Sequence, residues 1–191
     1  MVRLGGWAIA ALCWLALPYA SLTAQEFNVD AVHSTILFRV KHLNCSYAYG
    51  RFNEMTGKFL LSKAHPETSS IQVEVNMASI DTANTDRDKH LKGPDFFNVA
   101  QFPKASFKST KITAKGEHQF LVEGELSMAG VTKPVHFTAT LTGEGPSPIG
   151  DQRQGFEAEI MFKRSDFGLK YALQMLGDDV KLIVSFEGMR K

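Results

Sequence analysis

The chain has 191 residues, and its 21 Lys and Arg against 20 Asp and Glu give a formal net charge of +1 at neutral pH. This length suits one domain, with or without a removable segment. A chain so close to neutral has no net field that would draw it to nucleic acid or to an anionic membrane surface, so we expect neither as a partner.

The first 24 residues have the pattern of a secretory signal peptide. Arg3 precedes an apolar run at 7–17, Pro18 ends that run, and Ala24 completes a small-residue cleavage site. The apolar run is too short to span a bilayer. We therefore predict a signal peptide at 1–24, a domain at 25–191, a periplasmic location and no stable membrane insertion after cleavage.

Cleavage at this site would change the charge and the cysteine content. It removes one arginine and no acidic residue, which leaves 20 basic and 20 acidic side chains. Cys13 is lost and Cys45 remains, so no internal disulfide is available. The fold must rest on its hydrophobic core, and a homodimer linked through Cys45 stays open.

Alternation of apolar and polar residues, which is typical of half-buried strands, dominates the rest of the chain. Turn-forming Gly, Pro, Asn and Ser separate the alternating runs. The connections are short enough for antiparallel neighbours, so we predict an all-β, antiparallel barrel or sandwich in one domain. About eight strands are expected, at 34–42, 49–62, 71–77, 104–112, 120–128, 135–141, 156–162 and 180–186.

The alternation stops between Met77 and Phe102, in a stretch that includes "SIDTANTDRDKHLKGPDFF" at 79–97. Thr82, Asn84 and Thr85 are N-cap candidates, and acidic residues follow in what would be the first helical turn. Gly93-Pro94 is a helix stop signal. We predict one or two short helices at about 82–99, with the aspartates serving as caps and Phe96-Phe97 docking the helix on the strands.

Motifs for metal binding and nucleophilic catalysis are absent from the sequence. The six histidines form no HxxxH or HExxH arrangement, and no CxxC, GxSxG or SxxK occurs. Cys45 lies near His42, but a lone cysteine is more often a small hydrophobic residue than a nucleophile. The sequence therefore predicts no metal, no cofactor and no catalytic residue.

The 14 phenylalanines, spread along the predicted strands, leave two readings of the interior. An eight-stranded barrel has an interior that is either filled by its side chains or able to hold one small ligand. The pattern alone favours neither a filled core nor a cavity.

Six ordered blocks of the sequence resemble the YceI-like family of exported bacterial proteins, along nearly the whole of 25–191. The blocks are "DAVHSTILFRVKH", "GRFNEMTG", "SIDTANTDRDKHLKGPDFF", "FPKASFKST", "GELSMAGVTKPV" and "RSDFGLKY", with "GDDVKL" before the last strand. The resemblance implies a lipocalin-like, eight-stranded antiparallel barrel whose apolar cavity holds a polyisoprenoid, a quinone or a fatty amide. It implies no catalytic activity.

This resemblance, combined with strand parity, suggests ligand contacts. We expect six phenylalanines to line the cavity around the lipid tail: Phe38, Phe107, Phe120, Phe137, Phe156 and Phe167. Motif position suggests that His33, Arg51, Asp86 and Arg87 lie near the polar head group. The sequence departs from the usual family pattern at "NCSYAY" (44–49), where bulkier Tyr47 and Tyr49 are expected to change the cavity outline.

The main hypothesis is thus an exported protein that binds an amphiphilic lipid for carriage, storage or sensing. One alternative is an enzyme that acts on such a lipid with His42 or His90 and an aspartate. Another is a stress-related binding partner that needs no ligand.

Overall fold

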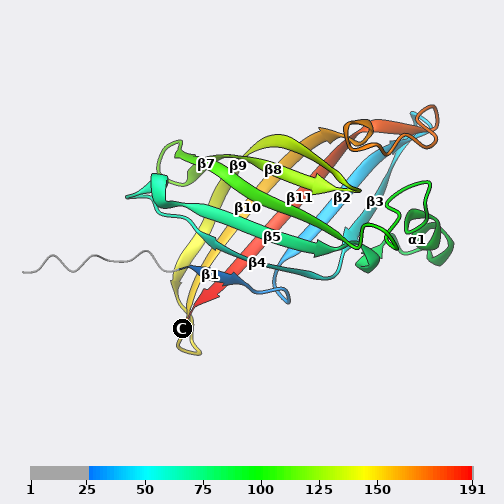
Figure 1. Cartoon of the computed structure of the whole chain (residues 1–191). Helices are drawn as coiled ribbons and strands as arrows, with labels where there is room; N and C mark the ends of the chain where they lie inside the picture. The colour runs from blue at the N-terminus through cyan, green and yellow to red at the C-terminus, as the bar shows by residue number, and fades with distance from the viewer. Residues whose placement is uncertain (1–25, 191) are drawn as a thin grey trace, which may run out of the picture.

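The computed structural model describes residues 26–190, which form one antiparallel β-structure with a short helix at one end (Figure 1). The signal-peptide prediction for 1–24 falls outside the described residues. The strands are β1 (Phe27–Val29), β2 (Thr35–His42), β3 (Ser46–Phe52), β4 (Met55–Leu60), β5 (Ser70–Asn76), β6 (Ile80–Asp81), β7 (Lys104–Ala114), β8 (Gln119–Met128), β9 (Val131–Pro146), β10 (Gln152–Lys163) and β11 (Leu176–Arg190).

These eleven strands build the predicted eight-stranded barrel because three of the eight barrel strands are each interrupted once. β11 pairs with β2 along most of its length and with β1 at its C-terminal end. In the same way, β2 pairs with β3 while β1 pairs with β4, and β3 pairs with β6 while β4 pairs with β5. The pairs β1–β2, β3–β4 and β5–β6 are therefore three long, interrupted strands.

Hydroxyl groups satisfy the backbone where the strands break. The Ser79 Oγ accepts hydrogen bonds from the amides of Asn53 (3.1 Å) and Glu54 (3.0 Å), between β3 and β4. The Ser34 Oγ accepts one from the Glu187 amide (3.0 Å), between β1 and β2. The barrel thus bends at these points without leaving those amides unpaired. The continuous strand that the sequence predicted at 49–62 is corrected to two strands around this break.

The helical interruption is helix α1 (Thr85–Leu91), whose N-cap is Asn84. The Asn84 side chain accepts a hydrogen bond from the Arg87 amide at 2.9 Å, and Asp88 accepts two from Thr82, through its amide and its hydroxyl. Turns follow α1 as far as residue 101. The Phe97 ring contacts the ring of Phe52 from β3, with centroids 6.1 Å apart, so the docking role predicted for this segment is realised by Phe97.

One wall of the barrel is incompletely closed. β9 and β10 pair from Pro146 and Gln152 as far as Ala139 and Ala158, where the ladder between them ends. The remainder of β9 (131–138) pairs with β8, while the remainder of β10 (159–163) pairs with β11. The two strands therefore separate towards the end of the barrel that carries α1, as Figure 1 shows.

Two groups of buried side chains fill the barrel at different levels. One contains Phe27, Phe59, Phe120, Val122 and Phe156, together with residues packed around them. The other contains Ile36, Phe52, Met77, Phe167 and Val184 and receives Leu91 and Phe97 from the α1 segment. No helix in the described part of the chain has both the length and the apolar character needed to cross a membrane.

Candidate functional site

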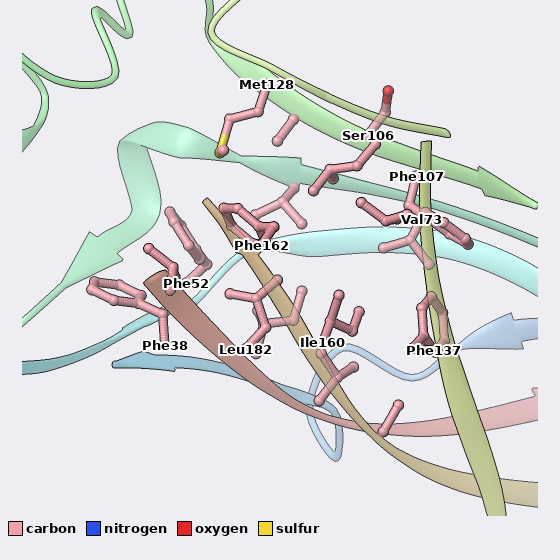
Figure 2. A pocket seen from close by; sticks show the side chains of 18 of the residues that line it. Phe38, Phe52, Val73, Ser106, Phe107, Met128, Phe137, Ile160, Phe162 and Leu182 are labelled. Atoms are coloured by element: carbon pink, nitrogen blue, oxygen red, sulfur yellow. The ribbon is translucent and has the colours of Figure 1, made fainter. Parts of the chain in front are cut away.

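A partly open cavity of about 200 Å³ runs along the inside of the barrel. Apolar side chains from β2, β3, β4, β5, β7, β8, β9, β10 and β11 form its wall. Figure 2 shows Phe38, Phe52, Val73, Phe107, Phe137, Ile160, Phe162 and Leu182 around this space. Such a wall offers dispersion contacts and burial to a ligand but few hydrogen-bonding groups.

The cavity is long for its volume. Along β10 and the residue that follows it, the lining residues run from Phe156 to Arg164. Eight residues of extended chain cover on the order of 25 Å. Because the volume is small for that length, the cavity is narrow and suits an extended chain better than a bulky ring system.

Four of the six phenylalanines predicted for the cavity are among its lining residues: Phe38, Phe107, Phe137 and Phe156. Phe107 and Phe137 contact each other across β7 and β9, with ring centroids 5.3 Å apart. Phe156 packs edge-on against Phe59 at 5.4 Å, and these two rings also belong to the packed group at one end of the barrel. They form the floor of the cavity.

Phe120 and Phe167 are placed differently from that prediction, because each lies behind a lining ring. Phe120 is 2% exposed and contacts Phe156 with centroids 6.2 Å apart. Phe167 is 1% exposed and contacts Phe162 at 5.2 Å. Phe167 lies in the 3₁₀ turn Arg164–Phe167 rather than in a strand, so strand parity does not apply to it. Both rings support the cavity wall from behind.

The end of the cavity opposite its floor is built by two segments. Leu91, Phe96 and Phe97 come from α1 and the turns after it, and Leu169 and Leu176 flank the loop before β11. An aromatic cluster joins the two segments, because the Tyr171 ring contacts those of His90 (5.3 Å) and Phe96 (5.2 Å). We call this the α1 end of the cavity.

Arg164, a buried cavity-lining residue that the sequence analysis did not select, fixes the loop at the α1 end. Its guanidinium donates hydrogen bonds to four backbone carbonyls, those of Leu169, Tyr171, Leu176 and Gly177, at 2.8–2.9 Å. Burial lowers the pKa of this guanidinium, which the nearby charge of Asp178 opposes. The sequence contained a signal for this residue. Every second residue from Phe156 to Phe162 is apolar and faces inward, and the same alternation places Arg164 on the inner face.

The four residues predicted to lie near a head group are not among the cavity-lining residues in the described chain. Arg51 pairs with Asp81 at 3.1 Å on the outside of the barrel, and His33 pairs with Asp30 at 2.8 Å. Asp86 is exposed in the first turn of α1, and Arg87 donates hydrogen bonds to the Thr82 Oγ1 (2.7 Å) and carbonyl (2.6 Å). The structure thus gives His33, Arg51 and Arg87 protein partners of their own.

A His/Asp pair does exist at the α1 end. The His90 Nε2 lies 3.0 Å from an oxygen of Asp95, and both side chains are about half exposed. His42 is exposed at the end of β2. Neither histidine is a lining residue of the cavity, so a lipid tail held there would not contact either ring.

A separate polar cluster lies at the break between β1 and β2. Asp30, His33 and Glu187 have donor atoms within 4.8 Å of one another, a spacing that could hold a metal ion. However, Nη1 of Arg153 contacts Asp30 at 2.6 Å and Glu187 at 2.7 Å. The His33 hydrogen bond lowers the pKa of Asp30 to about 2, with a further contribution from Arg153 against the effect of burial. Because the guanidinium already supplies a cation, we assign this cluster as an ion-pair network.

Comparison with known proteins places this chain in a family. Residues 27–188 match the YceI-like domain, which spans the whole described barrel apart from its ends. The chain belongs to the YceI-like family. A UPF0312 protein of Pseudomonas aeruginosa is 40% identical over 187 residues, covering 94% of this chain and 97% of that relative.

Solved structures show the same fold. BcnA of Burkholderia cenocepacia superimposes with a TM-score of 0.76 at 23% identity, over 83% of this chain and 98% of that one. A domain of Saccharophagus degradans described as polyisoprenoid binding gives a TM-score of 0.68 at 15% identity, over 86% of this chain and 98% of that one.

The departure from the YceI-like pattern at 44–49 does not affect the cavity as expected. Tyr47 and Tyr49 are 46% and 53% exposed and lie on the outer face of β3. Arg39 and Lys41 of β2 stack on the Tyr47 ring, 4.4 and 4.8 Å from its centroid. Alternation along β3 directs these tyrosines outward, so the expectation of a changed cavity outline is corrected to a changed outer surface.

Proposed function

We propose that this protein binds the extended apolar tail of an amphiphilic lipid, of the polyisoprenoid class, inside its barrel. The observation that carries the proposal is the long, narrow cavity with an almost wholly apolar wall. The proposal also covers export to the periplasm, which the pattern of residues 1–24 supports, and a role in carriage, storage or sensing rather than in catalysis.

The energetics suit a tight but exchangeable complex. Burying several hundred Å² of an isoprenoid tail stabilises the complex by on the order of 10 kcal/mol at about 25 cal/mol per Å². The loss of translational and rotational freedom offsets a large part of this. Affinity then depends on the match between tail and cavity more than on particular polar contacts.

The composition of the wall favours an isoprenoid over a quinone ring within the cavity. The polar residues among the lining set are Ser106, Glu157 and Arg164, and all the guanidinium hydrogen bonds of Arg164 described above go to its own loop. Buried quinone carbonyls would need donors, whereas an isoprenoid tail needs none. The solved S. degradans domain with this fold is itself described as polyisoprenoid binding, which agrees with the proposal.

Native mass spectrometry of the protein as purified, followed by solvent extraction, tests the proposal. We expect one apolar molecule per chain. Ala158→Phe, which places a ring in the cavity wall, should reduce the bound fraction at least about tenfold, because the tail and the ring compete for the same volume. Ser185→Phe is the matched control, since Ser185 is exposed on the outside of β11. A chain that carries no lipid and takes up no added polyprenol would overturn the proposal.

A further inference from the structure

Within residues 26–190, six of the ten large hydrophobic side chains that are notably exposed gather in two short segments at the α1 end of the barrel. Each of the six is between 40% and 54% exposed. They are Leu43, Tyr47 and Tyr49, around the β2–β3 turn, and Tyr171, Leu173 and Met175, in the loop before β11. We call these six residues the apolar tip.

The two segments of the apolar tip form one surface. The Leu43 amide donates a hydrogen bond to the Met175 carbonyl at 2.7 Å, and His42 pairs with Leu176 in the sheet. Arg164 holds the second segment from inside through the carbonyls of Leu169, Tyr171, Leu176 and Gly177. The apolar side chains are therefore presented by an anchored loop, and soluble proteins seldom leave such a group exposed without a partner.

Basic residues flank both segments of the apolar tip: Arg39 and Lys41 lie on β2, and Lys170 lies in the loop before β11. Arg51 is paired with Asp81 at 3.1 Å and adds no net charge. Several nearby acidic residues have partners within the protein: Asp178 accepts hydrogen bonds from Ser165, Asp179 pairs with Lys163 at 2.9 Å, and Asp95 lies 3.0 Å from His90. The overall neutrality of the chain predicted no attraction to anionic membranes, but the fold gathers basic residues beside exposed Tyr, Leu and Met.

We propose that the apolar tip docks on the headgroup region of an anionic lipid bilayer. Tyrosine suits that region because its ring is apolar and its hydroxyl is polar, and basic side chains beside it add attraction to anionic lipids. Leu176 and Leu169, which adjoin the apolar tip in the chain, line the cavity. Docking would thus bring the α1 end of the cavity to the membrane. A lipid could then pass between the membrane and the cavity. That exchange rests on the proposed function, whereas the docking itself does not.

An environment-sensitive fluorophore reports docking residue by residue. In the full chain with Cys13→Ser and Cys45→Ser, the label is attached at Leu173→Cys or at Ile149→Cys. Ile149 is 80% exposed in the β9–β10 turn, at the opposite end of the barrel (Figure 1). With vesicles of phosphatidylcholine and phosphatidylglycerol, we expect a several-fold emission increase with a blue shift at position 173 and none at 149. Equal responses at both positions would overturn the docking surface.

The basic residues give a second measurement. Lys170→Gln should weaken partitioning to anionic vesicles about fivefold, whereas Lys115→Gln, in the β7–β8 turn, should leave it unchanged. A spectral change at position 173 that occurs without vesicles and accompanies self-association in sedimentation would assign the apolar tip to a contact between two chains and overturn membrane docking.

Docking and lipid binding can fail separately. Leu173→Ser should lose vesicle binding but still take up polyprenol supplied from cyclodextrin, while Ala158→Phe should dock normally and take up at least about tenfold less. A wild-type chain that holds lipid but ignores vesicles would overturn this inference alone. A chain that docks but remains empty would overturn the proposed function alone.

Discussion

The two ends of the barrel are built from the same alternating strands, yet one is closed by packed aromatic rings and the other by a helix and a loop at the end of the cavity. At the packed end each ring of the series Phe27, Phe59, Phe156 and Phe120 contacts the next, with centroid distances of 5.4–6.2 Å. At the α1 end β9 and β10 separate, and a helix and a loop supply the wall instead. The alternation along each strand therefore determines which side chains face inward. The separation of the strands determines whether those side chains contact one another.

Replacing one fully enclosed ring and one cavity-lining ring tests this difference and should give the largest effect. Phe120→Ala removes a fully enclosed ring and should cost about 3–5 kcal/mol of unfolding free energy. Phe137→Ala removes a ring that already borders empty space, so we expect about 1–2 kcal/mol together with weaker lipid binding. Urea denaturation and lipid uptake measure the two responses, and equal stability losses would contradict the comparison.

The next effect concerns the anchor of the α1 end. Arg164→Met leaves four backbone carbonyls without their donor and should lower the free energy of unfolding by about 2–4 kcal/mol. Hydrogen exchange should accelerate in residues 168–177 while the packed end stays protected. Arg164→Lys keeps the charge but cannot reach all four carbonyls, so an intermediate result is expected. Unchanged protection of the loop in Arg164→Met would show that Arg164 does not anchor it.

A smaller effect should appear on acidification, through the Asp30 network. The pKa of Asp30 is about 2 in the folded chain, below the ordinary value of 3.8, so protonation of this carboxyl favours the unfolded state. The stability that Asp30 contributes is present above pH 4 and is lost as the pH falls towards 2, by up to about 2 kcal/mol. Across this pH range the melting temperature of wild type should fall more steeply than that of Asp30→Asn. Identical slopes would contradict a stabilising role of the Asp30 carboxylate.

His33, in the same network, gives the stability a pH dependence of the opposite sign. The hydrogen bond to Asp30 raises the pKa of its imidazole. The stability from the charged ring is therefore complete below the ordinary pKa of 6.5 and is lost as the pH rises through the folded value. Wild type should lose this increment in that upper range, and His33→Gln should not.

The smallest effect is expected for the exposed pair of Arg51 and Asp81. Arg51→Gln should change the free energy of unfolding by no more than about 0.5–1 kcal/mol, because solvent screens such pairs. It should also leave the lipid content unchanged if Arg51 has no part in head-group binding. A loss of bound lipid at unchanged stability would instead restore Arg51 as a head-group contact.

Much of the fold was predictable because burial imposes a period of two on the strands. The alternating runs located the eight barrel strands, and the break in alternation located α1 with its Asn84 cap. The strand breaks were not predictable, because the Ser79 and Ser34 hydroxyls that stabilise them act on distant residues. In the site, parity selected four lining phenylalanines but could not distinguish Phe120, which faces inward behind Phe156. The apolar tip arises from contact between residues 43 and 175, which no local pattern contains.

The separation of β9 and β10 also bears on how this chain avoids aggregation. A strand edge without a neighbour is a template for the same edge of another molecule. Pro134 lies in the part of β9 that lacks a β10 partner, beside the exposed Lys133. A proline cannot donate to a new ladder, and a lysine brought against its own copy repels it. Pro134 and Lys133 thus make this part of β9 a poor template for pairing with the edge of another molecule.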